Sequence, residues 1–229
     1  MNATKIIMMG ATGAVGNEVV KTLLKMPKVA QLTLIGRRPV ENIDSKFTSQ
    51  HSVDIFNTNS YKLYLAGHNI AICTLGVGQP SKISKEEFVS IDKDAVLSFA
   101  SACKQAGISH FQLLSSVGAD STSSSFYLRT KGELEDGLKA LGFARLSLFH
   151  PSMIITPTNR YGLSQAFFLS VMPLINPLLI GSLSKFRSIK VEALGQAIAL
   201  NIRKIANDTN VEDLYWRDFI AMSKTVEEG

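Results

Sequence analysis

The sequence has few of the features that mark several large classes of protein. Only two of its 229 residues are cysteines, Cys73 and Cys103, and they have neither a CxxC spacing nor a neighbouring histidine. Such isolated thiols are typical of buried side chains in a reducing compartment, not of a disulfide framework. The amino terminus does not look like a signal peptide either, since the short apolar stretch IIMMG runs directly into the glycines that follow it. We therefore expect a cytoplasmic protein.

Charge and histidine patterns exclude two further classes. The 24 basic and 19 acidic residues give a formal net charge of +5, but no five like charges stand in a row. Scattered charges do not form the basic stripe that nucleic acid requires, so no nucleic-acid partner is expected. The carboxylates do not gather in sequence around any histidine, and no metal site is expected. The four histidines, none at ligand spacing, are His51, His68, His110 and His150.

No apolar run is long enough to cross a membrane. The most apolar segment, residues 161–183, is interrupted by Pro173 and Pro177 and carries the polar residues Gln165 and Asn176. A transmembrane helix needs about 20 continuous apolar residues. Three roles remain open for this segment, in this order: the wall of a substrate pocket, a subunit contact in a homo-oligomer, and a shallow membrane contact.

Short apolar runs alternate with helical patterns along most of the chain. This alternation favours an α/β fold with a doubly wound parallel sheet and right-handed crossovers. With 45% hydrophobic residues, one domain over residues 1–229 is expected. The predicted strands are 5–9, 31–35, 52–55, 70–75, 110–114 and 144–149, and the predicted helices are 17–26, 85–106, 127–141 and 191–205.

Three glycines follow the first predicted strand. Gly10, Gly13 and Gly16, in GATGAVG, stand between this strand and a helix. There the backbone N–H groups and the helix dipole can face a pyrophosphate, and the missing side chains allow its close approach. An ordinary strand-to-helix turn is the alternative, but the placement favours a dinucleotide site.

The end of the second predicted strand indicates which dinucleotide is bound. An acidic residue at this point would contact the ribose hydroxyls of NAD, but the sequence reads TLIGRR. Arg37 and Arg38 instead offer permanently charged planar donors for the 2′-phosphate of NADP. The alternative is a solvated basic pair at the start of a loop.

A tyrosine and a lysine supply a candidate proton donor. Tyr127 and Lys131 stand four residues apart in FYLRTKGELE, so a helix places them on one face, where the ammonium favours an ionised phenol. Ser115 and Ser116 follow the fifth predicted strand and could hydrogen-bond a substrate carbonyl. Strand-end serines also serve as helix caps, but beside Tyr127 and Lys131 we interpret them as catalytic candidates.

Together, GATGAVG, TLIGRR, LLSSVGAD, YLRTKGELE and HPSMI resemble an atypical short-chain dehydrogenase/reductase, most closely the Tat-interacting-protein-like oxidoreductase group. The resemblance covers most of the chain in the expected order. It implies a Rossmann fold that binds NADP(H), in which residues 151–229 form a small substrate-side region.

The resemblance also implies roles for individual residues. Tyr127 matches the catalytic acid/base, Lys131 the residue that holds the nicotinamide ribose and lowers the tyrosine pKa, and Ser116, with Ser115 as its rival, the hydroxyl that polarises the carbonyl. His150 departs from the pattern, because relatives often have arginine before this proline, which puts the detail of the substrate side in doubt. The matching cofactor-site positions are Gly10, Thr12, Gly13, Ala14, Val15, Gly16, Arg37, Arg38, Leu75, Gly76, Pro151, Met153 and Ile154.

These features predict an NADPH-dependent oxidoreductase that transfers a hydride between the nicotinamide and a carbonyl or alcohol substrate. One alternative is a non-catalytic NADP(H)-binding regulator that senses redox state. The tyrosine–lysine pair favours an enzyme over such a regulator. An isomerase or epimerase that retains its cofactor is a third. The substrate itself does not follow from the sequence.

Overall fold

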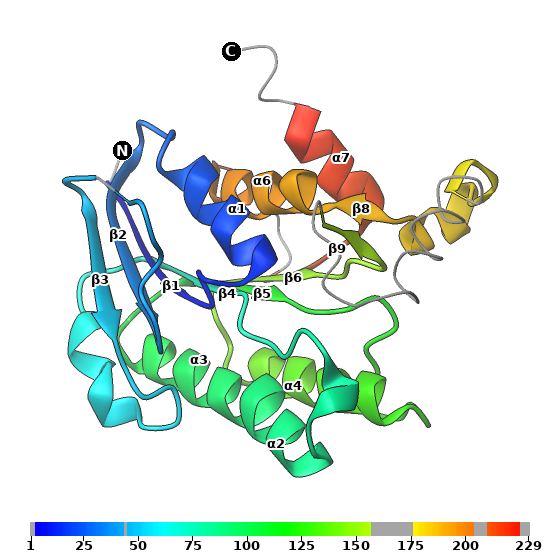
Figure 1. Cartoon of the computed structure of the whole chain (residues 1–229), viewed down its shortest axis with the longest axis horizontal. Coiled ribbons are helices and arrows are strands. Elements are labelled where there is room, and N and C mark those ends of the chain that lie inside the picture. The colour runs from blue at the N-terminus through cyan, green and yellow to red at the C-terminus, as the bar shows by residue number, and fades with distance from the viewer. Residues whose placement is uncertain (1–2, 44, 157–175, 204–209, 225–229) are drawn as a thin grey trace.

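A seven-stranded parallel sheet forms the centre of the protein in a computed structural model, which describes residues 3–43, 45–156, 176–203 and 210–224 (Figure 1). The strand order is β3-β2-β1-β4-β5-β6-β9, and each neighbouring pair is parallel. The predicted doubly wound α/β fold is confirmed. The strands are β1 (Thr4–Met9), β2 (Val29–Gly36), β3 (Thr48–Ser52), β4 (Ile70–Cys73), β5 (His110–Leu114), β6 (Arg145–Phe149) and β9 (Val211–Leu214).

Helices cover both faces of this sheet. Figure 1 shows α1, α6 and α7 on one face and α2, α3 and α4 on the other. A separate two-stranded ladder pairs β7 (Ile154–Ile155) with β8 (Ile189–Lys190). The helices are α1 (Ala14–Leu23), α2 (Lys85–Val89), α3 (Ala95–Gln105), α4 (Phe126–Ala140), α6 (Val191–Leu200) and α7 (Trp216–Lys224).

The first strand divides the hydrophobic core into two parts. Ile6 and Met8 pack with α1 and α6, whereas Ile7 and Met9 pack with α3 and α4. Successive side chains of a strand point to opposite faces, so a central parallel strand is apolar along its whole length. This is why KIIMM was recognisable as a strand.

Both cysteines lie in the core on the α3 and α4 side, as expected for structural thiols. Burial raises the pKa of the Cys73 thiol to about 12, and burial also holds the pKa of Cys103 well above its ordinary value. Thiols that remain protonated are poor nucleophiles. Neither cysteine therefore has the properties of a reactive site.

Several boundaries differ from those predicted. The strand expected at residues 52–55 is wrong, because the third strand is the polar edge strand β3, whose side chains give no apolar signal. The long helix expected at 85–106 is divided by a π-helical turn at Ser90–Asp94. The last predicted helix ends early, since α6 stops at Leu200, and β9 and α7 were not predicted.

The apolar segment at 161–183 is only partly described. Residues 161–175 lie outside the described residues, and Asn176–Leu178 and Gly181–Phe186 are short 3₁₀ helices. Within the described parts of the chain, no helix is both long enough and apolar enough to cross a membrane.

Candidate functional site

The candidate site lies where the strand order reverses. β1 is the first strand in the chain, and it lies between β2 and β4 in the sheet. In open α/β sheets, ligands bind beyond the carboxyl ends of the strands at such a reversal. The glycine loop follows β1 there, and Thr74 Oγ1, just after β4, donates a 3.0 Å hydrogen bond to the carbonyl oxygen of Gly10.

Two of the three loop glycines are required by the fold. Gly10 has φ +94°, and a Cβ there would lie 2.4 Å from the backbone nitrogen of Leu75. A Cβ on Gly16 would lie 2.2 Å from the carbonyl oxygen of Gly10. Gly13 is different, because its φ is −71° and its nearest protein atom would be an ordinary 3.4 Å away. The space before Gly13 is thus left open by the protein itself.

The amino terminus of α1 is suited to a phosphate. Gly13 is its N-cap, and neither a side-chain cap nor an acidic residue occupies the first turn. The free N–H groups of the first turn and the positive end of the helix dipole can therefore bind an anion. Ala14 begins the helix, whereas the Val15 side chain is buried in the core, so only its backbone can face a ligand.

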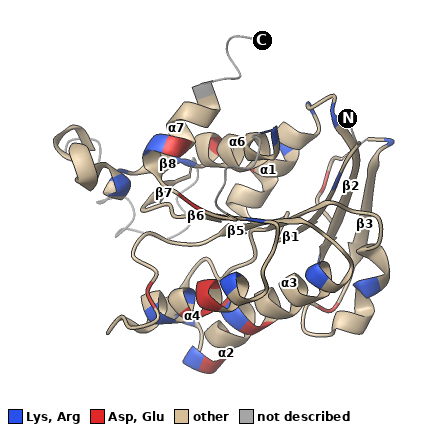
Figure 2. Cartoon of the chain, turned by 180° about the vertical axis from the view of Figure 1, so that it is seen from behind, with Lys and Arg blue, Asp and Glu red and all other residues tan. Residues whose placement is uncertain are grey.

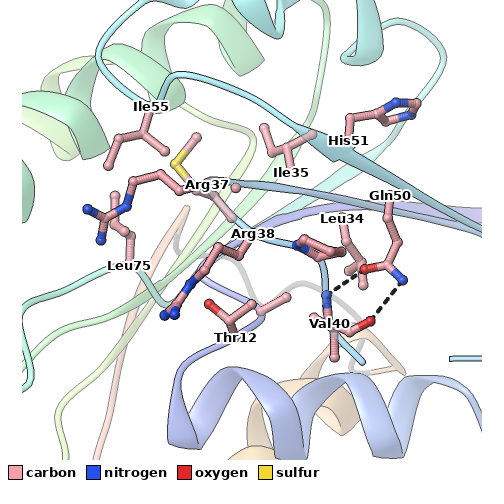
Figure 3. A pocket seen from close by; sticks show the side chains of 15 residues that line it. Thr12, Leu34, Ile35, Arg37, Arg38, Val40, Gln50, His51, Ile55 and Leu75 are labelled. Atoms are coloured by element: carbon pink, nitrogen blue, oxygen red, sulfur yellow. Dashed lines mark hydrogen bonds between the residues drawn. The ribbon is translucent and has the colours of Figure 1, made fainter. Parts of the chain in front are cut away.

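Both arginines predicted to bind the 2′-phosphate line a pocket beside this loop. Figure 3 shows Arg37 and Arg38 extending from the end of β2 over the pocket. The side chain of Gln50 holds the following turn through two hydrogen bonds to the backbone of Val40, at 2.7 and 3.1 Å. No acidic residue is among the described residues that line it. The pocket also includes Gly10, Thr12, Gly36, His51, Ile55 and Leu75.

Tyr127 and Lys131 lie on α4, as their spacing predicts. Ser125 caps this helix, and its hydroxyl accepts a hydrogen bond from the backbone N–H of Leu128. Tyr127 is half-buried, with its ring 5.6 Å from that of Phe88 between centroids. Lys131, one turn further, is buried.

The charge on Lys131 is held by a carboxylate that sequence reasoning missed. Lys131 Nζ lies 2.7 Å from Asp92 Oδ1, and their side chains are 5% and 3% exposed. Burial by itself lowers the pKa of Lys131, but the negative charge of Asp92 opposes this effect, and the pKa of Lys131 lies above its ordinary value. The lysine is therefore a buried cation, paired with Asp92 and one helical turn from Tyr127.

Asp92 also joins this pair to the loop after β4. Its Oδ2 accepts a 2.7 Å hydrogen bond from the backbone N–H of Val77, and a Cβ on Gly76 would lie 3.2 Å from Oδ1. A signal for Asp92 existed, because it falls on the apolar face of its helix, four residues from Phe88 and from Val96. A carboxylate on such a face requires a partner.

The structure separates the two candidate serines. Ser115 is buried, and its hydroxyl donates to the carboxylate of Glu135. Ser116 is half-buried, and among the described residues its hydroxyl makes only a 3.5 Å contact with the carbonyl oxygen of Val117. Ser116 is therefore the hydroxyl that remains available to a ligand.

The remaining predicted cofactor residues do not all line the pocket that Arg37 and Arg38 line. Leu75 lines it, and Gly76 lies beside Asp92, but Pro151, Met153 and Ile154 do not line it. The carbonyl oxygen of Pro151 accepts a 2.9 Å hydrogen bond from Val117, which places it close to Ser116. Met153 and Ile154 continue into the ladder with β8.

In the folded chain, two carboxylates lie beside His150, although neither lies near it in the sequence. Its Nε2 lies 2.9 Å from Glu135 Oε1 and 3.9 Å from Asp213 Oδ1, and its ring stacks on Tyr215. These carboxylates come from α4 and β9, far from His150 in sequence, so spacing gave no signal. Donor atoms of the three residues lie within 4.8 Å of one another. Lys139 Nζ, 3.9 Å from Glu135 Oε2, would oppose a cation there.

Comparison with known proteins identifies the class. A sequence model described as NAD(P)H-binding matches residues 10–146, which include the glycine loop, both arginines, Tyr127 and Lys131. The chain thus belongs to the NAD(P)H-binding Rossmann proteins, and within them to the atypical short-chain dehydrogenase/reductase family.

Curated relatives support this family. The chain is 36% identical over 157 residues to "Protein HTATIP2" from Rattus norvegicus, covering 68% of this chain and 64% of the relative. It is 34% identical over 154 residues to "Protein fmp52, mitochondrial" from Emericella nidulans, covering 65% of this chain and 66% of the relative. The matched region therefore spans slightly less than two thirds of the length of these relatives.

Solved structures share the fold. "MoeE5 in complex with UDP-glucose and NAD" superposes with a TM-score of 0.68 at 15% identity, covering 97% of this chain and 81% of the other. A UDP-N-acetylglucosamine 4-epimerase from Methanobrevibacter ruminantium M1, in complex with UDP-N-acetylmuramic acid, gives 0.69 at 16% identity, covering 100% and 84%. At such identities the likeness is one of fold alone.

The expectation of a cytoplasmic protein is contradicted by the relatives. Those from Emericella nidulans, Meyerozyma guilliermondii and Candida albicans are named as mitochondrial proteins. The expectation rested on the short apolar stretch at the amino terminus, and secretion signals are not the only targeting signals.

Proposed function

We propose that the protein is an NADP(H)-dependent oxidoreductase that reduces a carbonyl or oxidises the corresponding alcohol. The observation that carries the proposal is the buried Lys131 ammonium one helical turn from Tyr127, with the Ser116 hydroxyl left available. A cation fixed beside a phenol stabilises the negative charge that the phenol develops when it gives up its proton.

NADP is the form of the cofactor that the arginines favour. Arg37 and Arg38 extend over a pocket that no described acidic residue lines, so a 2′-phosphate would meet two cations and no repulsion (Figure 3). The bare amino terminus of α1 would receive the pyrophosphate. When bound, the nicotinamide supplies or accepts a hydride.

The chain's own residues would provide acid/base chemistry and orientation. In the reducing direction, the carbonyl carbon gains a hydride while Tyr127 donates its phenolic proton to the carbonyl oxygen. Ser116 donates a hydrogen bond to the same oxygen, which holds it and stabilises its developing charge. Lys131 stabilises the resulting phenolate until a proton from water restores the phenol. We place the substrate among carbonyl or alcohol compounds, on the side of residues 151–229.

An activity panel tests the proposal. Purified protein is mixed with NADPH and a series of aldehydes and ketones, and oxidation of NADPH is followed by absorbance; alcohols with NADP test the reverse direction. We expect turnover of at least one compound and none without protein. Tight NADPH binding with no turnover of any compound would contradict an enzyme and favour a redox-sensing regulator. Turnover without net oxidation of the cofactor would favour an isomerase.

A further inference from the structure

An exposed apolar segment, residues 176–186, projects from the body (Figure 1). It consists of two short 3₁₀ helices, Asn176–Leu178 and Gly181–Phe186. Most of the large apolar side chains that are exposed on the described surface lie here. They are Leu178 (74% exposed), Ile180 (70%), Leu183 (51%) and Phe186 (40%).

Three of these side chains form a stripe. Residues three apart eclipse one another in a 3₁₀ helix, so Leu183 lies above Phe186. The backbone N–H of Leu183 also donates a 3.1 Å hydrogen bond to the carbonyl oxygen of Ile180, which continues the turn backward by one residue. Ile180, Leu183 and Phe186 therefore line one side of the segment.

Another side of the same helix is anchored to the body. Ser184 is buried, and Arg217 of α7 donates a 3.2 Å hydrogen bond to the carbonyl oxygen of Gly181. Arg187 stacks over the ring of Trp216 at 4.7 Å. These contacts attach the segment to α7, while the side chains of the apolar stripe stay exposed.

Basic residues accompany the stripe. Lys185 lies over the Phe186 ring, with Nζ 5.3 Å from its centroid, and Lys190 is exposed shortly beyond. The sequence contains no aspartate or glutamate from residue 137 through residue 191. In Figure 2 the projecting segment accordingly carries blue and no red. Exposed apolar side chains flanked by cations are the composition that binds anionic membrane surfaces.

We propose that the stripe Ile180, Leu183 and Phe186, together with Lys185, attaches the protein to the surface of an anionic lipid bilayer. The apolar side chains would enter the boundary between headgroups and acyl chains, and the lysines would meet the lipid phosphates. A second copy of the chain fits less well, because a two-fold contact sets the same patch against itself and would bring like charges together.

Vesicle co-sedimentation tests this attachment. The full chain is incubated with vesicles of phosphatidylcholine alone or with about 25% phosphatidylserine, the kind of anionic lipid that recruits basic segments. We expect binding to the anionic vesicles that weakens as salt is added. The double variant Ile180→Ser/Leu183→Ser should lower the partition coefficient by about tenfold or more, because two apolar side chains no longer enter the lipid. Lys185→Glu should lower it as well.

Matched controls lie at the other end of the molecule, in the 3₁₀ helix Lys62–Tyr64 (Figure 1). Leu63 is 81% exposed, so Leu63→Ser removes an apolar side chain that is more exposed than Ile180 or Leu183, and Lys62→Glu makes the same charge change as Lys185→Glu. Both controls should bind vesicles like wild type, and circular dichroism should show all variants folded. The proposal is overturned if wild type ignores anionic vesicles, if the double variant binds like wild type, or if the double variant only converts a dimer to a monomer in light scattering.

Discussion

Lys131 Nζ and Asp92 Oδ1 form a 2.7 Å ion pair in which both side chains are almost fully buried. Asp92 at the same time accepts the backbone N–H of Val77 from the loop after β4. The pair thus connects the helix that carries Tyr127 to the loop beside the cofactor pocket. The two residues come from different helical elements, Asp92 from the π-helical turn at Ser90–Asp94 and Lys131 from α4.

The first prediction concerns the stability that this pair provides. Asp92→Asn keeps the shape of the side chain but removes the charge opposite Lys131. Loss of one partner from a buried pair costs about 3 kcal/mol or more, so we expect the free energy of unfolding in urea to fall by about that amount. Glu133→Gln is the control, because its pair with Lys93 is partly exposed and should cost less than about 1 kcal/mol.

The pH dependence of the pair follows from Lys131. Burial by itself would lower the pKa of Lys131 in the folded protein. The charge of Asp92 raises it, and the pKa lies above the ordinary 10.5. The folded chain therefore holds this proton more tightly than the unfolded chain, and the added stability is fully present below pH 10.5 and is lost as pH rises beyond it. Urea titrations across this range should show wild type and Asp92→Asn converging at alkaline pH. A constant difference would remove Lys131 as the cause.

The glycine loop allows fold and binding to be separated. Gly13→Val should leave the chain folded, because Gly13 has an ordinary φ and no protein atom closer than 3.4 Å to an added Cβ, yet it should abolish NADPH binding by filling the phosphate space. Gly16→Val should instead destabilise the fold, since its Cβ would lie 2.2 Å from a backbone oxygen. Circular dichroism and NADPH fluorescence measure the two effects. Normal NADPH binding by Gly13→Val would show that the loop is only a turn.

A further prediction concerns the choice of cofactor. A charge-assisted phosphate contact contributes about 1.5 to 3 kcal/mol, so NADPH should bind at least about tenfold more tightly than NADH. Arg37→Ala/Arg38→Ala should remove this preference while NADH affinity changes little. Lys28→Ala, an exposed lysine before β2, is the charge control. Calorimetric titration of both nucleotides decides the matter, and equal affinities in wild type would contradict the role of the arginines.

The sequence predicted the doubly wound parallel sheet and the NAD(P)-binding family, because those features depend on local signals. Apolar runs mark buried parallel strands, and GATGAVG and TLIGRR are contiguous. Asp92 and Glu135 were missed because their partners, Lys131 and His150, come from other elements. The edge strand β3 was misplaced because TSQHS is polar. Long-range pairing of buried charges leaves no fixed spacing in a single sequence.

The two serines give predictions with opposite outcomes. Ser116→Ala should lower turnover, about tenfold or more in kcat, with little effect on stability, because within the described parts of the chain its hydroxyl has only a 3.5 Å contact. Ser115→Ala should instead lower stability by about 1 to 3 kcal/mol, since it deprives the buried carboxylate of Glu135 of a donor. Thermal unfolding and steady-state kinetics on both variants distinguish the roles. The reverse pattern would make Ser115 the catalytic hydroxyl.

The most direct test of the mechanism is a comparison of NADPH affinity and turnover in Tyr127→Phe. Tyr61→Phe, which removes a buried hydroxyl whose contact is Thr58 at 3.4 Å, serves as the control for loss of a phenol elsewhere. With any carbonyl substrate from the panel, Tyr127→Phe should bind NADPH like wild type but turn over about 100-fold more slowly or worse, as loss of a general acid does. Turnover of Tyr127→Phe at the wild-type rate would show that Tyr127 is not the proton donor.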